Sequence, residues 1–362
     1  MRYNNYEIEL YRPDYISGVS DVQKYLYGLG REATAEYFHW KYEENPYADE
    51  PLGIVAVYKG KIIGYRGYFV TKWEIGNKDI TALILSSSDV IVRPDHRRRG
   101  LFRAMTEMAL SEYEHRGYAG YINLTSNQYS TPGELQLGWV NIATRKTLRK
   151  YGLTGLVKYF LIQKMHLGIK GFNLKQGRFG NIEITYKLKP EEMCSVLGHQ
   201  DYKTDKIRLF RDVDFLRWKY RNNFKRYIFC YSWEDDLVTG YLVLGVTRYS
   251  PENTNKANII DFAQLREGTI HKILGHITSE SHSNIFDLWS YDTEDTLISD
   301  FKDHRFSEHD LILKIQKRLR GERYLLVRPI KKNYDEKDWF IHGFDMRDPA
   351  NWEIGEVCAE AI

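Results

Sequence analysis

The first 150 residues alternate between strand-like and helix-like patterns of apolar and polar positions. Apolar residues at every second position, bounded by turn residues, predict strands over about 6–11, 53–70, 79–92, 118–124 and 139–149. Between about 100 and 115 the apolar positions recur at spacings of three and four, which predicts a helix. Further helical patterns cover about 14–44 and 132–137. This order predicts an α+β, or mixed α/β, fold in which a mostly antiparallel mixed sheet is flanked by helices.

A similar series of patterns recurs in the second half of the chain. The triplet Trp40-Lys41-Tyr42 returns as Trp218-Lys219-Tyr220, and a predicted hairpin follows each triplet. The Gly-Tyr pair of that hairpin lies 24 residues after Trp40 in the first copy and 22 residues after Trp218 in the second. A repeat of about 175 residues is too long for a solenoid unit, so we interpret the chain as a duplicated domain.

The repeat sets the expected domain boundaries. The first domain covers 1–150, and a connecting helix and linker cover 151–180, where several glycines loosen the chain. A degenerate second copy covers 181–330. The remaining residues, 331–362, form a tail that we expect to pack on the second domain.

Composition and charge exclude several classes of protein. The 362 residues are 43% hydrophobic and 28% charged with a net charge of +3, which is typical of globular proteins rather than of disordered or nucleic-acid-coating chains. The three cysteines, Cys194, Cys230 and Cys358, are far apart and indicate neither a disulfide framework nor a zinc site. No apolar run approaches the ~20 residues that span a bilayer, and the N-terminus has no apolar signal region. We therefore expect a soluble cytoplasmic protein, a monomer or homodimer, with no metal, nucleic-acid or membrane partner.

The most informative segment runs from Asp89 to Met105, where a predicted strand ends, Pro94 turns the chain and a helix begins near Gly100. The backbone N–H groups of a helix's first turn have no internal acceptor, and the helix dipole adds positive potential there. A glycine lets a bulky anion approach that backbone. The segment therefore predicts an anion-binding loop suited to a pyrophosphate, without the dinucleotide or P-loop fingerprint. Its cationic side chains are Arg93, Arg97, Arg98, Arg99 and Arg103.

This loop resembles the acyl-CoA loop of the GNAT N-acetyltransferase superfamily, whose motif is Arg/Gln-x-x-Gly-x-Gly/Ala. The matching residues are Val92, Pro94, Arg97, Gly100 and Met105. The segments 127–130 and 137–139 resemble the family's downstream Asn-x-x-Ala and Gly-Phe signatures. The resemblance covers about residues 5–150, and the second copy resembles the same fold only weakly. The tandem arrangement is similar to GNAT proteins of bacterial polysaccharide biosynthesis, and more loosely to the FemAB-like and Eis-like tandem enzymes.

The resemblance implies a set of residues that bind acetyl-CoA as the acyl donor. The loop amides would hold the pyrophosphate, and a strand amide near Ile91 or Val92 would meet the oxyanion. Asn127 would contact the pantetheine arm, or cap the helix after Ser130. The implied binding residues are Ile91, Val92, Arg97, Arg98, Arg99, Gly100, Leu101, Phe102, Arg103, Asn127 and Ser130.

Three residues are candidates for proton transfer. Asp89, on the strand before the loop, is the candidate base that would deprotonate the amine. Tyr129 is the nearest phenol that could protonate the leaving thiolate, and Glu134 is the second candidate. Two positions depart from the family pattern: Phe102 stands where a Gly or Ala is expected, and Glu134 stands where many members carry the acid Tyr.

Three functions are compatible with these residues. The first is transfer of an acetyl group from acetyl-CoA to a primary amine of a small molecule, with an amino sugar as one acceptor that the resemblance suggests. The second is a FemAB-like aminoacyl transferase that uses charged tRNA. The third is a non-catalytic acyl-CoA-binding module. The second copy has Asp261 to Gly268 at the place of the loop, without the arginine-to-glycine spacing, so we expect it to bind no CoA.

Overall fold

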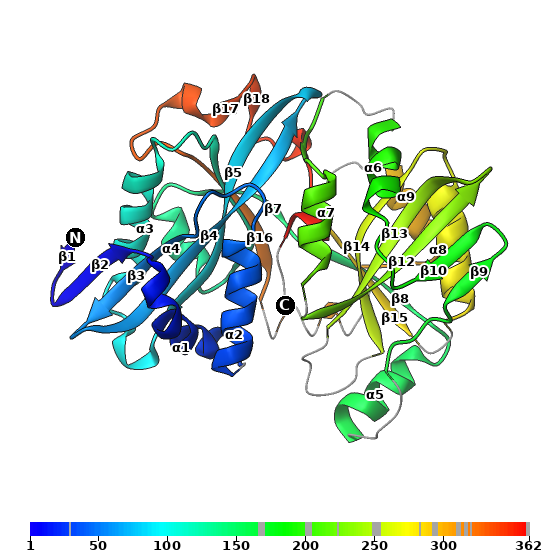
Figure 1. Cartoon of the computed structure of the whole chain (residues 1–362), viewed down its shortest axis with the longest axis horizontal. Helices are drawn as coiled ribbons and strands as arrows, with labels where there is room; N and C mark the ends of the chain where they lie inside the picture. Colours follow the sequence, from blue (N-terminus) through cyan, green and yellow to red (C-terminus); the bar gives the residue numbers. More distant parts are fainter. Residues whose placement is uncertain are drawn as a thin grey trace. The chain divides into compact units, whose positions relative to one another are not determined.

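The computed structural model describes residues 1–28, 30–165, 171–199, 205–222, 224–247, 255–281, 284–291, 296–308, 313–314, 318 and 321–359. Contacts divide the chain into two compact units, each built from separate segments. Unit 1 comprises Met1–Thr144, Thr204–Phe210 and Gly321–Glu353. Unit 2 comprises Arg145–Lys203, Arg211–Arg320 and Ile354–Ile362. Both are mixed sheets flanked by helices, so the expected α+β fold class is confirmed (Figure 1).

The described strands of unit 1 form one sheet in the order β1-β2-β3-β4-β5-β6-β16-β7; in addition β11 pairs with β4, and β19 pairs with β11. Among these described strands, only β5 with β6 and β11 with β19 pair in parallel. The strands are β1 Arg2–Tyr3, β2 Tyr6–Leu10, β3 Leu52–Tyr58, β4 Lys61–Ile75, β5 Asn77–Val92, β6 Gly120–Asn127, β7 Val140–Thr144, β11 Ile207–Leu209, β16 Arg323–Pro329 and β19 Trp352–Glu353.

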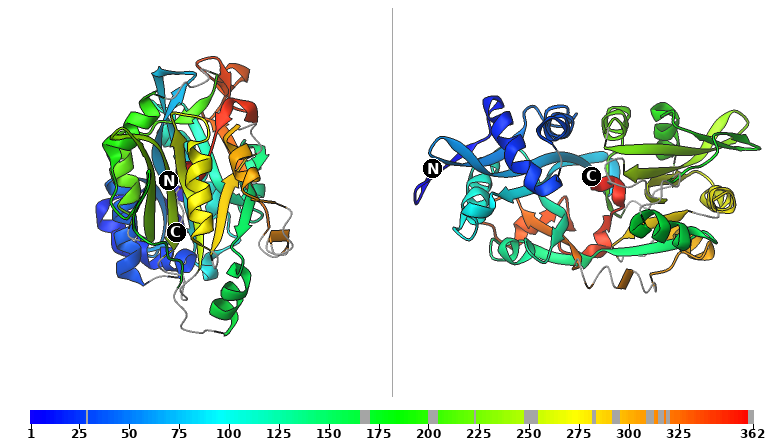
Figure 2. Two further views of the ribbon diagram at one scale, coloured as in Figure 1. Left: turned by 90° about the vertical axis from the view of Figure 1, so that its right-hand side faces the viewer. Right: turned by 90° about the horizontal axis from the view of Figure 1, so that it is seen from below.

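Helices cover both faces of this sheet (Figure 2). On one face lie α1 (Ile16–Tyr27) and α2 (Arg31–Phe38), which continues into a π-helical turn, His39–Glu43. On the other face lies α3 (Leu101–Tyr113), with the short α4 (Thr131–Leu135) after β6. The apolar side of α3, including Leu101 and Met105, is buried in the core against β2 to β5.

The described strands of unit 2 form a second sheet in the order β8-β15-β14-β13-β12-β10-β9. Its strands are β8 Lys146–Tyr151, β9 Gly177–Phe179, β10 Ile182–Thr185, β12 Lys225–Glu234, β13 Leu237–Thr247, β14 Lys256–Gln264 and β15 Ile285–Ser290. Its helices are α5 Gly155–Met165, α6 Pro190–His199, α7 Val213–Tyr220, α8 Thr269–Ser279 and α9 Thr296–Asp303.

Each unit contains a strand that the sequence order would assign to the other half of the chain. The single strand predicted over about 139–149 is two strands: β7 stays in unit 1, whereas β8 pairs with β15 of unit 2. Conversely, β16 comes from the second half of the chain but lies in the sheet of unit 1, between β6 and β7. The compact units therefore differ from the contiguous segments 1–150 and 181–330, which remain a prediction about the duplicated sequence.

The expected position of the tail is corrected. Residues 331–353 belong to unit 1, and only the last segment, Ile354–Ile362, belongs to unit 2. The reason is that β16 brings the following chain back to unit 1, where Arg328 binds the carbonyl oxygens of Leu137, Lys331 and Lys332. Trp352 then packs edge-on against Trp73, with 5.3 Å between the ring centroids.

Candidate active site

The loop between β5 and α3 presents a row of backbone N–H groups without acceptors. Among the described residues, no acceptor meets the amides from Arg98 to Arg103, and no side chain caps the helix. The first N–H to bond within α3 is that of Ala104, to Gly100 O at 3.0 Å. Arg98 and Gly100 have φ values of 61° and 76°, the left-handed conformation that turns successive N–H groups toward one side. These amides fit an anion such as the pyrophosphate of acetyl-CoA.

Gly100 has a specific steric requirement. A Cβ at this position would collide with the hydroxyl of Tyr3, and its positive φ disfavours side chains in any case. The loop predicted from sequence therefore has the expected glycine at the helix start. Leu101, the next residue, buries its side chain in the core, so only its amide remains for a ligand.

Most of the loop arginines have internal partners. Arg97 donates to Val92 O at 3.0 Å, and Arg99 donates to the hydroxyl of Tyr6 at 2.9 Å. Arg103 pairs with Glu107 at 2.8 Å. Among the described residues, no partner is found for the side chain of Arg98. These contacts fix the loop backbone and leave Arg98 as the side chain best able to bind an incoming phosphate.

The strand before the loop offers further backbone donors. β5 and β6 pair only from Ile84/Gly120 to Ser86/Ile122, and beyond that point they share no register. Arg93 N donates to Ile63 O at 2.8 Å. Because peptide groups alternate in direction along a strand, the N–H of Ile91 also faces β4, whereas that of Val92 faces away from it. Of the two amides predicted for the oxyanion, the amide of Val92 is therefore the better placed.

Phe102 packs against α4 rather than standing over the loop. A Cβ at Gly133 would lie 2.7 Å from the Phe102 ring, and the Arg66 guanidinium lies 5.0 Å from the ring centroid. The large side chain therefore points away from the amide row. The departure from the family's Gly or Ala keeps the Phe102 amide available.

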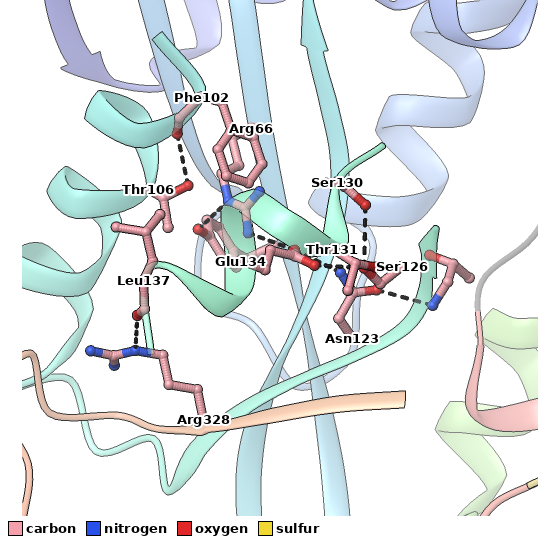
Figure 3. Close-up of polar contacts among 12 residues, drawn as sticks. Arg66, Phe102, Thr106, Asn123, Ser126, Ser130, Thr131, Glu134, Leu137 and Arg328 are labelled. Atoms are coloured by element: carbon pink, nitrogen blue, oxygen red, sulfur yellow. Dashed lines mark hydrogen bonds and ion pairs between the residues drawn. The ribbon is translucent and has the colours of Figure 1, made fainter. Parts of the chain in front are cut away.

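Glu134 lies in a fully buried network (Figure 3). Its carboxylate accepts hydrogen bonds from Arg66 at 3.3 Å, Asn123 at 2.8 Å and Ser126 at 2.7 Å. Burial would lower the pKa of Arg66, but Tyr68 and Glu134 more than offset burial and raise it, so the guanidinium stays charged. This network joins β4, β6 and α4 where β5 and β6 separate. These contacts fix the Glu134 carboxylate between β4 and β6, and its predicted role as a proton donor remains a prediction.

The residues after β6 form a turn at the surface. Asn127 Oδ1 accepts the N–H of Tyr129 at 2.9 Å, and Ser130 Oγ accepts the N–H of Asn127 at 3.3 Å. The side chain of Tyr129 is 84% exposed. Asn127 and Ser130 thus hold their own turn, and their predicted contacts with the pantetheine arm remain predictions, as does the role of Tyr129.

Asp89 is a buried anchor on β5. Its carboxylate accepts hydrogen bonds from Gln23 at 2.8 Å, Tyr42 at 2.9 Å and Tyr27, and forms an ion pair with Lys41 at 2.9 Å. Burial alone would raise the pKa of Asp89, but the Lys41 charge and the hydrogen bonds from Tyr27, Lys41 and Tyr42 hold it below its usual value. A carboxylate with this many donors is a weak base. Its geometry favours fixing α1 and the π-helical turn against β5.

Asp89→Asn is expected to destabilise the protein by about 3–5 kcal/mol at pH 7, because it leaves the buried Lys41 charge unpaired. Since the folded-state pKa of Asp89 is lowered, its contribution is present above the ordinary carboxyl pKa and is lost as pH falls below about 4. Urea unfolding between pH 2 and 7 should show this acid loss in the wild type and a flatter profile in the variant. The exposed Asp95→Asn variant is the control. Full stability of Asp89→Asn with abolished turnover would instead identify a general base.

Unit 2 repeats the anchor but not the loop. Asp261 accepts hydrogen bonds from Tyr220 at 3.3 Å and Tyr241 at 3.1 Å, as Asp89 does from Tyr42. At the start of α8, however, one backbone N–H already has an acceptor, since Gln264 Oε1 accepts the N–H of Ile270 at 2.8 Å. This helix start therefore has one free N–H donor fewer, and the expectation that unit 2 binds no CoA remains a prediction.

Comparisons with known proteins agree with this geometry. Residues 7–139 match the family model described as an acetyltransferase (GNAT) domain. A search of curated proteins finds no significant match. Among solved structures, the chain is similar to a GCN5-related N-acetyltransferase from Anabaena variabilis, with a TM-score of 0.60 and 11% identity over 90% of this chain and 73% of that chain.

Two further solved structures have the same fold. A conserved protein of unknown function from Enterococcus faecalis, described as a probable N-acyltransferase, has a TM-score of 0.61 and 11% identity over 90% of this chain and 73% of that chain. A tandem GNAT protein from the clavulanic acid biosynthesis pathway has a TM-score of 0.51 and 11% identity over 91% of this chain and 100% of that chain. Residues 7–139 therefore match an acetyltransferase (GNAT) domain, and the chain as a whole shares the fold of these solved structures.

Sequence reasoning missed the residues that support the loop. Arg66, Asn123 and Ser126 carry no motif, although a charged residue inside the apolar strand Gly64 to Tyr68 is a signal of a buried ion pair. Tyr3 and Tyr6 contact the loop from nearly one hundred residues upstream, which local patterns do not indicate. Among the described residues, no group of three His, Cys, Asp or Glu side chains is placed to hold a metal ion.

Proposed function

We propose that unit 1 binds acetyl-CoA at the β5–α3 loop and transfers its acetyl group to a primary amine of a small molecule. The observation that carries this proposal is the row of amides from Arg98 to Arg103, which have no acceptor among the described residues and stand beside Arg98. The acetyltransferase (GNAT) family match over residues 7–139 supports the same assignment.

The proposed reaction is direct transfer. The neutral amine attacks the acetyl carbonyl carbon, the amide of Val92 donates to the resulting oxyanion, and the carbon–sulfur bond then breaks. A thiol is a much stronger acid than an alcohol or an amine, as the ordinary pKa of about 8.5 for a cysteine thiol shows, so the thiolate of CoA can leave without a strong acid. Because Glu134 is held by Arg66 and Asn123, we propose Tyr129 as the remaining side-chain proton donor. The amine proton passes to solvent or to a base on the acceptor side.

An amino sugar is the acceptor that we propose to test first. Only the resemblance to GNAT proteins of bacterial polysaccharide biosynthesis supports this choice. The near-neutral charge of the chain does not favour charged tRNA as the donor.

The test combines binding with turnover. Acetyl-CoA at about 100 times its dissociation constant should stabilise the protein by about 2.7 kcal/mol, which thermal unfolding detects. A panel of amino sugars and other primary amines is then scored by CoA release and by the mass of the acetylated product. Stabilisation by acetyl-CoA with acetylation of at least one amine is expected. No stabilisation at millimolar acetyl-CoA would contradict the proposal.

A second candidate function is an acyl-CoA-binding module without turnover. The observation in its favour is that Asp89 and Glu134, the two carboxylates that the sequence suggested for proton transfer, both accept hydrogen bonds from buried donors. Tight acetyl-CoA binding with no CoA release across the amine panel would favour this second function.

A further inference from the structure

Unit 2 carries an exposed apolar helix face that the proposed acetyl transfer does not use. Leu153 precedes α5, and Leu156, Val157 and Phe160 lie within it. These four side chains are between 43% and 89% exposed. Their spacing of three and four residues places them on one side of the helix. Single exposed apolar residues are common on soluble proteins, but a contiguous group indicates a contact surface.

The helix is firmly attached at its base. The carbonyl oxygen of Gly155 accepts the side-chain N–H of the buried Asn255 at 2.8 Å, and Gly152 N donates to Asn284 O at 2.7 Å. Lys158 Nζ donates to Gly171 O at 3.2 Å, on the returning chain. In Figure 1 α5 projects from one end of unit 2. Hydrogen bonds to the rest of unit 2 therefore hold the start of the helix that carries the apolar face.

The charge around α5 indicates what it contacts. Residues 135–182 contain nine Lys or Arg and no Asp or Glu, although the whole chain has a net charge of only +3. The rest of the chain is therefore net negative. Lys146 and Arg149 pair with Glu308 and Asp287. Lys150 and Lys158 donate to the backbone carbonyl oxygens of His304 and Gly171. Lys175 and Arg178 are exposed. An exposed apolar patch within an acid-free, basic segment combines the two features, apolar area and positive charge, that favour binding to an anionic membrane.

We propose that α5 attaches the protein reversibly to an anionic membrane surface. Leu153, Leu156, Val157 and Phe160 enter the layer between headgroups and acyl chains, and the surrounding basic residues contact lipid phosphates. A second copy of the chain fits this face less well, because pairing would bring two basic segments together. None of the described helices is long and apolar enough to cross a membrane.

The experiment is flotation of the full-length protein with vesicles of phosphatidylcholine alone or with phosphatidylglycerol added. The wild type should float with the anionic vesicles at low salt, and added salt should reduce the bound fraction. The double variant Val157→Glu/Phe160→Glu should bind at least about tenfold more weakly. Leu237→Glu is the matched control, because Leu237 is also a 69% exposed apolar residue of unit 2 but lies at the start of β13. It should bind as the wild type does.

Three results would overturn the proposal. The wild type would fail to float with anionic vesicles at low salt, or the double variant would float as well as Leu237→Glu. The third is a wild-type dimer in light scattering that the double variant converts to monomer, which would assign the face to a second copy. Thermal unfolding of each variant confirms that the fold is intact. Vesicle binding does not require acetyl transfer, so the proposal stands or fails apart from the proposed function.

Discussion

Gly100→Glu should weaken acetyl-CoA binding by roughly 100-fold or more. The new carboxylate would stand among the amides from Arg98 to Arg103, where the donor's pyrophosphate is proposed to bind. Two like charges about 4 Å apart near a protein surface repel by about 4 kcal/mol, which exceeds a 100-fold change in affinity. The positive φ of Gly100 and the collision of any Cβ with Tyr3 add to this loss. Titration calorimetry with acetyl-CoA measures the affinity of each variant.

Gly268→Glu is the matched control for this change. Gly268 is the N-cap of α8 in unit 2, has a φ of 80° and faces open space, so the same substitution tests a helix start that should bind no CoA. Affinity for acetyl-CoA should remain near that of the wild type. Gly100→Asn, whose uncharged side chain tolerates the left-handed conformation, separates the effect of charge from that of shape. Unchanged affinity in Gly100→Glu, or an equal loss in Gly268→Glu, would contradict the loop assignment.

Glu134→Gln is expected to cost about 3–5 kcal/mol of stability and to raise the KM for acetyl-CoA. The substitution leaves the guanidinium of Arg66 buried without its counter-charge, although the hydrogen-bonding shape is kept. Because Arg66 also lies over the ring of Phe102, a disturbance there reaches the first turn of α3. Chemical unfolding and steady-state kinetics measure the two effects.

Asp287→Asn separates a general loss of stability from an effect on the site. Asp287 and Arg149 form a comparably buried ion pair in unit 2, at 2.6 Å, so its loss should cost similar stability. The KM for acetyl-CoA should remain unchanged in that variant. A Glu134→Gln variant of full stability whose kcat falls by about 10²–10⁴ with the loss of a limb in the pH profile would instead identify Glu134 as a general acid.

The strand, turn and helix start of the β5–α3 loop could be predicted from sequence because their geometry is local. A strand, a turn at Pro94, a glycine and a helix follow one another within a few residues, and the structure places Gly100 at the N-cap of α3. The repeated Trp-Lys-Tyr triplet also identified tyrosines with matching contacts, since Tyr42 donates to Asp89 in unit 1 and Tyr220 donates to Asp261 in unit 2.

The strand exchange could not be predicted, because it depends on which distant strands pair. The alternating pattern of β16 indicates only that one of its faces is buried. It does not indicate that β16 pairs with β6 and β7, which lie about 180 to 200 residues earlier in the chain. The surroundings of the two carboxylates could not be predicted from sequence either. Asp89 and Glu134 are the residue types that proton transfer needs, but whether such a group is free depends on donors that α1, β4 and β6 supply.

The most direct test of the account is calorimetric titration of the wild-type protein with acetyl-CoA, which gives the number of sites as well as the affinity. One site per chain is expected, present in Gly268→Glu and lost in Gly100→Glu. Two equal sites per chain, or no binding at millimolar acetyl-CoA, would contradict the claim that the loop of unit 1 alone forms the acyl-donor site.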